Sequence, residues 1–420
     1  MSDDPAIRRY SSRMRRARVV YFSVVLAIVV LVGAGVAVAW SNSEIAHVSM
    51  HTVGSGPPPL PIAAASRQLR RVWRTPDRTA IGDPQWHGTV VTYSPHTVRG
   101  RNARTGRRTW SYTRTDRSVC TAVQTAGITV AVYAKDGNCD ELTALDSNTG
   151  AIKWTRTLDE DGKPINGTPT YQVLSDTVLI SSHQVIYAID PSSGIDRWTW
   201  YHYGCAIHHV VLGSAGALIS QTCTQAQNCS GHKMCGPGNQ LLLRDGVAGY
   251  DQNSTRNPDQ VIWNRFGNTD IPVSADSLIS AVNPATRALQ TFTDQHGRAA
   301  GSVALTPPPP ALTPVTANTT ISGEIVWIGG RIYAIANRSQ RWTARADAPP
   351  TVVPPSGTQI PQDATARITA PRNGRVVAFS GRTGRVIRRF SVRAGGRGWS
   401  ARPLGAGLLV SSRSATAAYR

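Results

Sequence analysis

The chain has 420 residues, of which 40% are hydrophobic, and 45 basic against 25 acidic residues give a formal net charge of +20. This apolar content is enough for a folded core and excludes a wholly disordered chain. A positive charge of this size favours anionic partners such as lipid head groups or acidic polymers.

The N-terminal region predicts a membrane anchor. Residues Val19–Trp40 contain no charged side chain, and a run of about 20 apolar residues spans a bilayer as a helix. Arginines crowd its N-terminal side, so the positive-inside rule places residues 1–18 in the cytoplasm and the rest outside. The alternative is a cleaved signal peptide ending near Ala39, but its apolar core is usually only about 7–15 residues. We therefore expect a single-pass cell-membrane protein, a topology that argues against a nucleic-acid partner.

Residues 41–66, which follow the anchor, are small, polar and rich in proline, with the run Pro57-Pro58-Pro59-Leu60-Pro61. This composition predicts a partly stiff linker. From residue 67 to 420, short β-rich runs alternate with Gly, Asn, Asp and Pro, as in an all-β domain.

Three segments of this domain share one pattern: an apolar strand, Asp or Asn, a turn ending in Gly, and Trp four residues later. They end at Trp110, Trp154 and Trp198, which stand 44 residues apart. A period in the forties is typical of four-stranded β-propeller blades. A single such sheet cannot bury both faces, so the sheets must stack until the ring closes. The aromatic side chain is expected to pack between blades.

The two ends of the domain predict how the ring closes. Residues 70–74 look like the last strand of a repeat that nothing precedes, whereas residues 404–411 and 415–419 supply strands without an aromatic partner. We therefore predict that Trp73 completes the last blade. Eight blades are favoured, and seven are the alternative because residues 263 and 292 are too close for a full blade. The predicted blade-docking aromatics are Trp73, Trp110, Trp154, Trp198, Trp263, Phe292, Trp342 and Phe390.

The pattern Ala-x-Asp-x-x-Thr-Gly-x-x-x-Trp at residues 144–154 resembles the tryptophan-docking repeat of quinoprotein-type (PQQ-like) β-propellers, and residues 188–198 nearly match it. That family includes pyrroloquinoline quinone dehydrogenases and an outer-membrane assembly scaffold lipoprotein, so the resemblance implies a fold and does not choose a function. The dehydrogenases typically carry two adjacent cysteines and a carboxylate-rich Ca²⁺ site. This sequence has no adjacent cysteines and no compact acidic cluster, so we expect no cofactor, no metal and no enzymatic activity. Asp146 and Asp190 are interpreted as turn residues that hydrogen-bond their own backbone.

The six cysteines all follow the predicted anchor, and an even number in an oxidising compartment predicts three disulfides. Two pairs occupy similar places after Trp110 and Trp198, which favours Cys120–Cys139 and Cys205–Cys223 and leaves Cys229–Cys235. A metal site at residues 223–235, with His232, is the alternative.

Two further groups of residues were weighed for function. His208 and His209 have no accompanying Gly-x-Ser-x-Gly motif, so they are interpreted as ordinary blade residues. Between residues 364 and 420 there are twelve Arg and no acidic residue, and guanidinium groups bind phosphate and carboxylate through paired hydrogen bonds. The candidate surface for an anionic ligand or partner is Arg382, Arg385, Arg388, Arg389, Arg393, Arg397 and Arg402.

These observations favour a membrane-anchored, non-enzymatic scaffold that binds a partner protein, an envelope lipid or both. The alternatives are a PQQ-dependent oxidoreductase and a sensor ectodomain. The order of tail, anchor, proline-rich linker and propeller is also similar to an actinobacterial family of polar growth factors. That resemblance implies binding of trehalose monomycolate and assistance to its RND-type exporter during assembly of the mycomembrane.

Overall fold

The protein is described by a computed structural model, and its backbone contacts divide the chain into two units. The first comprises residues 1–49 and 113–116, and the second comprises residues 50–112 and 117–420. The structure describes residues 21–23, 25–32, 43–60, 69–82, 85–160, 163–165, 169–174, 176–201, 204–213, 215–224, 227–230, 233–235, 237–244, 259–265, 270–275, 279–292, 299–312, 315–320, 323–353, 367–372, 375–393, 399–405, 407–412 and 414–420.

The first unit contains the part of the predicted anchor that the structure describes. Residues 21–23 and 25–32 are helical, and all of their large apolar side chains are exposed, for example Leu31 at 72%. Within the described ranges, no helix combines the length and the apolar character needed to cross a membrane. Residues 1–18 and the remainder of Val19–Trp40 lie outside the described residues. A short 3-10 helix, η1 (Glu44–His47), follows.

The second unit is built from eight antiparallel sheets of four or more strands among the described residues. Numbered in chain order, the blades have the following strands. Blade 1 has β3 (Arg78–Thr79), β6 (Thr89–Ser94), β7 (Thr97–Asn102) and β8 (Arg108–Arg114), with β1 (Val48–His51) and β5 (Gln85–Trp86) in the same sheet. Blade 2 has β9 (Ser118–Thr125), β10 (Ile128–Lys135), β11 (Asn138–Asp146) and β12 (Ile152–Thr157), with β4 (Ile81–Gly82) added in parallel to β9. Blade 3 has β15 (Thr170–Leu174), β16 (Thr177–Ser181), β17 (Val185–Ile189) and β18 (Asp196–Tyr201).

The second half of the unit continues the same order. Blade 4 has β19 (Cys205–Gly213), β20 (Gly216–Cys223), β23 (Gly238–Arg244) and β24 (Asp259–Arg265). Blade 5 has β25 (Ile271–Ala275), β26 (Ile279–Val282), β27 (Ala288–Phe292) and β28 (Ala299–Ala304). Blade 6 has β29 (Val315–Thr320), β30 (Gly323–Ile328), β31 (Arg331–Ala336) and β32 (Ser339–Arg345). Blade 7 has β33 (Thr351–Val353), β34 (Arg367–Arg372), β35 (Arg375–Ser380) and β36 (Val386–Arg393). Blade 8 has β37 (Ser400–Leu404), β38 (Gly407–Ser411), β39 (Thr416–Tyr419) and β2 (Arg71–Thr75). Two small hairpins, β13 (Asp159–Glu160) with β14 (Lys163–Pro164) and β21 (Gln227–Ser230) with β22 (Lys233–Cys235), lie outside the blades.

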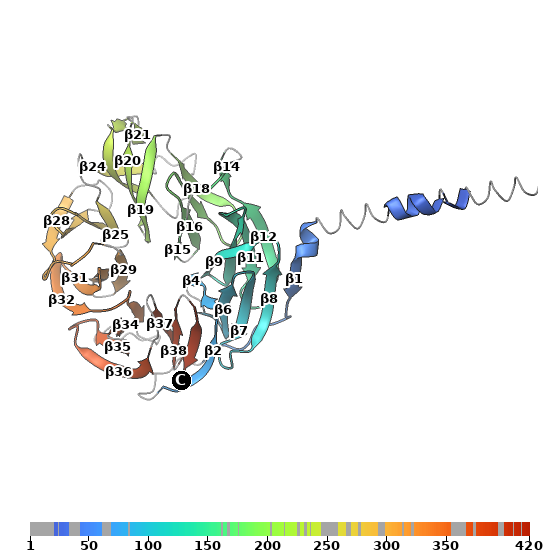
Figure 1. The fold of residues 1–420 in the computed structure, drawn as a ribbon. Helices are drawn as coiled ribbons and strands as arrows, with labels where there is room; N and C mark the ends of the chain where they lie inside the picture. Colours follow the sequence, from blue (N-terminus) through green and yellow to red (C-terminus); the bar gives the residue numbers. More distant parts are fainter. Residues whose placement is uncertain are drawn as a thin grey trace, which may run out of the picture. The chain divides into compact units, whose positions relative to one another are not determined.

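The eighth blade joins the two ends of the domain, as the sequence predicts. Strand β2 pairs antiparallel with β39, and Trp73 stands opposite Ala418. In Figure 1 the sheets follow one another around a ring, and the blue β2 lies beside the red β38 where the ring closes. The all-β class and the eight-blade count are therefore confirmed for the described residues.

Four of the predicted docking aromatics make the same contact with the next blade. Each indole N–H donates to the carbonyl three residues before the turn glycine of that blade, at 2.8–3.0 Å: Trp73 to Ala103, Trp110 to Ser147, Trp154 to Pro191 and Trp342 to Gly381. The turn glycine lies directly against the indole ring in each case. At these four positions the indole thus contacts the last turn of the next blade.

The turn that receives the indole is stabilised by its own first residue. The Asp146 carboxylate accepts the backbone N–H groups of Asn148 and Thr149, both at 3.0 Å. Asp190 accepts those of Ser192 and Ser193 in the same way. Both aspartates therefore have the structural role that the sequence predicts.

We expect Gly150→Ala to lower the free energy of unfolding by about 2–4 kcal/mol. The backbone at this position is in the left-handed region, which strains any residue with a Cβ, and the new methyl group would also be overpacked against the Trp110 side chain. A Cβ at Gly150, where φ is +75°, would lie only 2.8–2.9 Å from the Trp110 side chain. Gly137 is the matched control, since its φ is +88° and a Cβ there meets nothing within 4 Å. Gly137→Ala should cost only about 1 kcal/mol in the same denaturant titration. Equal losses in the two variants would show that the indole contact is unimportant.

The remaining docking positions depart from the repeat. Phe292 is buried between blades 4 and 5, but it lies on the third strand of blade 5, not the fourth as its place in the repeat predicts. The Asx turn of blade 5, at Asn283, connects β26 to β27 instead of the last two strands. This displacement explains why the interval from residue 263 to 292 is too short for a blade.

The other three aromatics complete the set. Trp198 is buried, and its indole N–H finds no acceptor among the described residues, while the Arg244 guanidinium lies 4.8 Å from the ring centre. Phe390 is buried in a cluster with Leu69 of blade 8. The side chain of Trp263 lies outside the described residues.

The predicted linker at residues 41–66 needs correction. Val53 donates its backbone N–H to the carbonyl of Thr149 at 3.1 Å, and Leu60 is 7% exposed in a cluster with Trp73 and Ala418. The extended backbone that proline imposes lets this segment follow the blades while Leu60 fills the seam between blades 8 and 1. Residues 53–60 are therefore part of the propeller. Residues 61–68 lie outside the described part of the chain.

The predicted disulfides are confirmed at two of three positions. Cys120 is bonded to Cys139 and Cys205 to Cys223, with Cα–Cα distances of 6.1 and 4.0 Å. Each bond joins two strands of one blade. The side chains of Cys229 and Cys235 lie outside the described residues, so the third pair stays a prediction.

Candidate functional site

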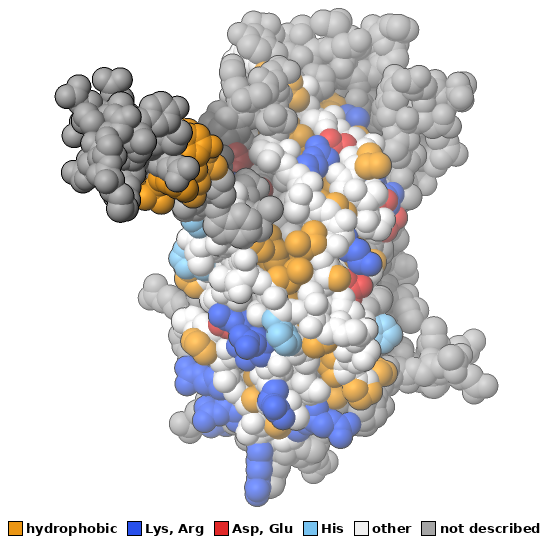
Figure 2. Space-filling view, turned by 90° about the vertical axis from the view of Figure 1, so that its right-hand side faces the viewer, with side chains coloured by type: hydrophobic (Ala, Val, Ile, Leu, Met, Phe, Trp, Pro, Cys, Tyr) orange, Lys and Arg blue, Asp and Glu red, His pale blue; other side chains and the backbone are white. Residues whose placement is uncertain are grey.

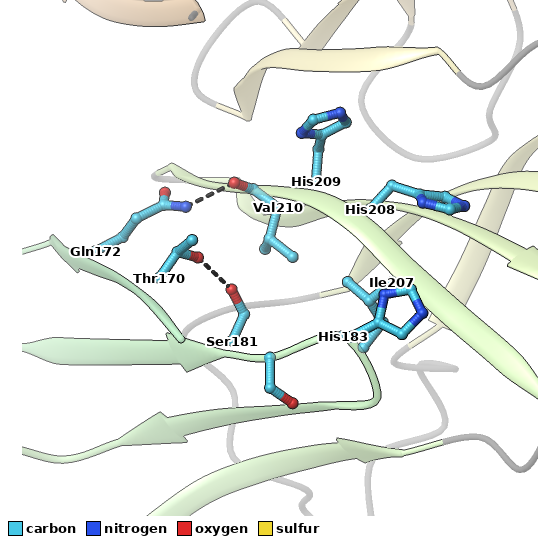
Figure 3. Close-up of a pocket in the computed structure, with 9 residues that line it drawn as sticks. Thr170, Gln172, Ser181, His183, Ile207, His208, His209 and Val210 are labelled. Atoms are coloured by element: carbon cyan, nitrogen blue, oxygen red, sulfur yellow. Dashed lines mark hydrogen bonds between the residues drawn. The ribbon is translucent and has the colours of Figure 1, made fainter. Parts of the chain in front are cut away.

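A cleft of about 300 Å³ opens between blades 3 and 4 and is the candidate functional site. Its walls are β15, β16 and the turn after β16 on one side, and β19 on the other (Figure 3). Because β15 and β19 begin their blades, they are neighbouring first strands in the ring. The polar side chains that line the cleft include Thr170, Gln172, Ser181, His183, His208 and His209.

Hydrogen bonds across the cleft fix the spacing of the two blades. The Gln172 amide donates to the carbonyl of Val210 at 2.6 Å and accepts the N–H of Leu212 at 2.8 Å. The backbone of Ile207 donates to the carbonyl of His183 at 2.7 Å, which ties the turn after β16 to β19. These hydrogen bonds link the two walls of the cleft.

The three histidines come from two different blades. The register between β19 and β20 shifts between Ile207 and His209, so His208 occupies a β-bulge. The bulge turns its ring toward His183, and the two ring centres are 6.2 Å apart in an edge-to-face arrangement. Figure 3 shows the His209 ring pointing away from the His183 ring. The second ring nitrogen of His208, Nε2, lies 2.8 Å from the Thr222 hydroxyl.

The environment favours the neutral form of two of these imidazoles. Burial, and then the neighbouring His183, lower the pKa of His208. Burial and the neighbouring His208 likewise lower the pKa of His209. A neutral imidazole can both donate and accept a hydrogen bond. The cleft also contains the Thr170 and Ser181 hydroxyls, which lie 2.7 Å apart and bond each other. The cleft can therefore hydrogen-bond a polar group of a ligand. Over the described ranges, no three His, Cys, Asp or Glu side chains lie close enough together to hold a metal ion.

The histidines predict a pH-dependent stability. Since their pKa values are lowered on folding, the unfolded chain binds protons first as the pH falls. The free energy of unfolding should therefore have its full value above about pH 7. It should decrease as the pH falls through about 6.5 and below, where the histidines of the unfolded chain take up protons. The variant His208→Gln/His209→Gln should lose part of this dependence between pH 7.5 and 5, whereas exposed His51→Gln should keep it. An unchanged slope in the double variant would contradict the assignment.

The predicted arginine surface is present in part. Arg382, Arg385 and Arg389 are exposed on the last turn and the last strand of blade 7. Arg388 and Arg402 are half-buried and have interactions within the protein. Arg397 and the side chain of Arg393 lie outside the described residues. Figure 2 shows Lys and Arg side chains gathered at the lower end of the second unit. This is the end at which β2 lies in Figure 1.

Sequence reasoning missed the cleft. His208 and His209 were visible as a pair, but no sequence pattern places His183 beside them, because its turn precedes a different strand in another blade.

Comparison with known proteins supports the repeat assignment. Residues 70–200 match the family model described as outer membrane protein assembly factor BamB. This range includes Trp73, the three repeats that end at Trp110, Trp154 and Trp198, and blades 1–3. No curated protein matches the sequence.

Several solved structures share the fold at low sequence identity. BamB from Moraxella catarrhalis is 16% identical, with a TM-score of 0.50 over 84% of this chain and 97% of that chain. Sqt1 from Saccharomyces cerevisiae is 10% identical, with a TM-score of 0.51 over 85% and 99%. The computationally designed Ika8 protein is 9% identical, with a TM-score of 0.51 over 84% and 100%. At sequence identities this low, the structural likeness shows the fold alone, and the function must be argued from the site. Residues 70–200 are therefore similar to the BamB family model, and the solved structures show that the chain has a β-propeller fold.

Proposed function

We propose that the chain is a membrane-anchored scaffold of the cell envelope whose propeller binds a partner protein outside the cytoplasm. The observation that carries this proposal is the match of residues 70–200 to a family described as an outer membrane protein assembly factor. The matched segment includes β2, the strand that pairs with β39 and closes the ring of this chain.

The helical residues of the first unit support membrane attachment. Tyr21, Phe22 and Leu31 are 67%, 68% and 72% exposed, and the neighbouring valines and isoleucine are exposed as well. A continuous apolar surface of this kind needs lipid or another protein to cover it. Together with the arginines that precede it in the sequence, it supports an N-terminus in the cytoplasm and a propeller on the other side.

The propeller supplies a rigid platform for binding. Interblade indole contacts, Asx turns and two disulfides hold the described blades together. Scaffolds need such surfaces, and the polar cleft between blades 3 and 4 is one place where a partner loop can form hydrogen bonds.

Photo-crosslinking in intact membranes tests the scaffold function. Lysine reagents would reach few positions, because the chain has only four lysines. A photoreactive amino acid at Ile195, which is 68% exposed on blade 3, should capture one envelope protein reproducibly. The matched position Ile387, 52% exposed on blade 7, should capture a different set, since a specific partner covers one side. Failure to capture any protein from several exposed positions would contradict the proposal.

The oxidoreductase alternative has its own test. The purified chain is incubated with pyrroloquinoline quinone and Ca²⁺, and reduction of a dye is followed with alcohol and sugar substrates. We expect no activity above that of the cofactor alone. Substrate-dependent reduction would replace the scaffold with an enzyme.

The narrower expectation of a glycolipid cargo stays a prediction. None of the matches named above concerns trehalose monomycolate or its exporter, and none is an actinobacterial polar growth factor. Native mass spectrometry of the purified chain would reveal a retained glycolipid as a discrete added mass.

A further inference from the structure

Closure of the ring brings together arginine-bearing segments that are far apart in the sequence. The ring of Trp73, on β2, packs against Gly106 in the last turn of blade 1, and its indole N–H donates to Ala103. Strand β2 and this turn are therefore direct neighbours. Together with the residues next to them in sequence, they carry six exposed arginines: Arg70, Arg71, Arg74, Arg104, Arg107 and Arg108.

Blade 7 extends this surface on the other side of β2. Phe390 of β36 shares a buried cluster with Leu69, which immediately precedes Arg70. The turn and strand just before Phe390 carry the exposed Arg382, Arg385 and Arg389. We call the combined surface the arginine rim, formed by residues 382–389 of blade 7, 70–74 of blade 8 and 104–108 of blade 1.

The charge of the rim is not compensated by nearby acids. None of its three segments contains Asp or Glu. The nearest acidic residue in sequence, Asp77, is buried and paired with Arg99 and Arg101. Over the described part of the chain, no ion pair joins the exposed arginines of the rim to a carboxylate.

The equivalent positions of blades 2 and 3 are built differently. There Asp146 faces Lys153 at 3.6 Å, Asp196 pairs with Arg156 at 2.6 Å, and Asp190 lies 3.4 Å from Arg197. The same turn and strand thus carry balanced charges in two blades and only positive charges in the rim. The last strand of blade 6 also carries exposed arginines, Arg341 and Arg345, without an acidic residue, so the one-sided charge extends from blade 6 to blade 1.

Exposed apolar side chains lie among the arginines. Val72 is 46% exposed between Arg71 and Arg74, and Ile387 is 52% exposed between Arg385 and Arg389. Alternation of cationic and apolar side chains on an open surface is typical of segments that rest at a lipid interface.

We infer that the arginine rim docks on the anionic lipid head groups of the membrane in which the chain is anchored. The inference rests on the proposed anchorage. An open surface spread over three blades fits many repeated phosphates better than one small ligand, and guanidinium groups bind phosphate through paired hydrogen bonds. The seven residues between Trp40 and β1 can span at most about 25 Å, so an anchored propeller stays near the bilayer.

The full chain is tested in nanodiscs of phosphatidylcholine, with or without phosphatidylglycerol. A photoreactive amino acid at Val72 or Ile387 should form lipid adducts, detected as a mass shift, only when phosphatidylglycerol is present. The double variant Arg107→Gln/Arg385→Gln should reduce the adduct about tenfold or more, because each arginine near an anionic surface adds to the electrostatic attraction. Added salt should weaken the same attraction by screening it. The matched control Lys153→Gln/Arg197→Gln removes two positive charges from blades 2 and 3 and should leave the adduct unchanged.

Each other outcome overturns the inference. Equal adducts in both lipids would mean that only apolar contact is made, and equal loss in both double variants would mean that net charge alone matters. The absence of lipid adducts would exclude lipid docking, and capture of an acidic protein from membranes by Val72 would reassign the rim to that partner. Carbonate extraction tests the proposed anchorage separately. If the chain stays in the membrane after this treatment, the proposed anchored scaffold is retained even where the lipid docking is contradicted.

Discussion

Trp110→Ala should lower the free energy of unfolding by about 3–5 kcal/mol, which is the usual cost of removing a fully buried aromatic side chain. Trp110 is 0% exposed, and its indole lies against both Gly100 and Gly150. Truncation would open a cavity between blades 1 and 2 and leave the carbonyl of Ser147 without its indole donor. The measurement is the midpoint and slope of a urea or guanidinium unfolding curve.

Two matched variants separate the contributions at this position. Trp110→Phe keeps most of the buried area but loses the hydrogen bond, so we expect a loss of about 1–2 kcal/mol. Trp154→Ala removes the equivalent side chain from blade 2, where the indole is only half-buried, and should cost less than Trp110→Ala. A Trp110→Ala protein as stable as the parent would show that the interblade indole does not hold the ring.

Asp77→Ala should cost about 2–4 kcal/mol, because it leaves two partly buried guanidinium groups without their counter-charge. The carboxylate of Asp77 bonds Arg99 at 3.1 Å and Arg101 at 2.7 Å, and it accepts the Thr92 hydroxyl. The backbone carbonyl of the same residue accepts the Thr416 hydroxyl from β39. Asp77 thus links the closing blade to blade 1.

The same residue should contribute to acid sensitivity. Burial alone would raise the pKa of Asp77, but the hydrogen bond from Arg101 and the charges of Arg99 and Arg101 outweigh burial and lower it. A lowered pKa stabilises the folded state above the unfolded value near 4, and this contribution disappears as the pH falls through the folded value.

The control for Asp77 is an ion pair with more solvent around it. Asp196 and Arg156 are 30% and 26% exposed at the side chain, so Asp196→Ala should cost only about 0.5–1 kcal/mol. The two variants are compared in denaturant titrations at neutral pH and at pH 3. If Asp77→Ala cost no more than Asp196→Ala, the ion cluster would have no special part in closure.

The repeat itself could be predicted because each blade solves the same local problem. An Asx residue, a left-handed glycine and a tryptophan stand at fixed spacing, and the spacing determines which backbone carbonyl receives the indole. Closure by Trp73 followed from an unpaired strand at each end. The disulfides followed from the equivalent places of two cysteine pairs in their repeats.

What could not be predicted depends on contacts between segments without a shared pattern. The proline-rich segment looked like a free linker, because nothing in its sequence shows that Leu60 fills a seam made by blades 8 and 1. The hairpin shift in blade 5 moved Phe292 to another strand although the local motif was read correctly. The rim and the cleft depend on which blades are neighbours, and that order exists only once the ring has closed.

The most direct test of the account is a covalent link across the closing strands. Arg74 and Ala417 are paired in the register of β2 and β39, and paired strand positions are close enough for a disulfide. The variant Arg74→Cys/Ala417→Cys should form this bond under mild oxidation, detected by peptide mapping. The control Arg74→Cys/Val410→Cys should not, because Val410 lies one strand further away. No bond in the first variant, or equal bonding in both, would contradict a propeller that is closed by its N-terminal strand.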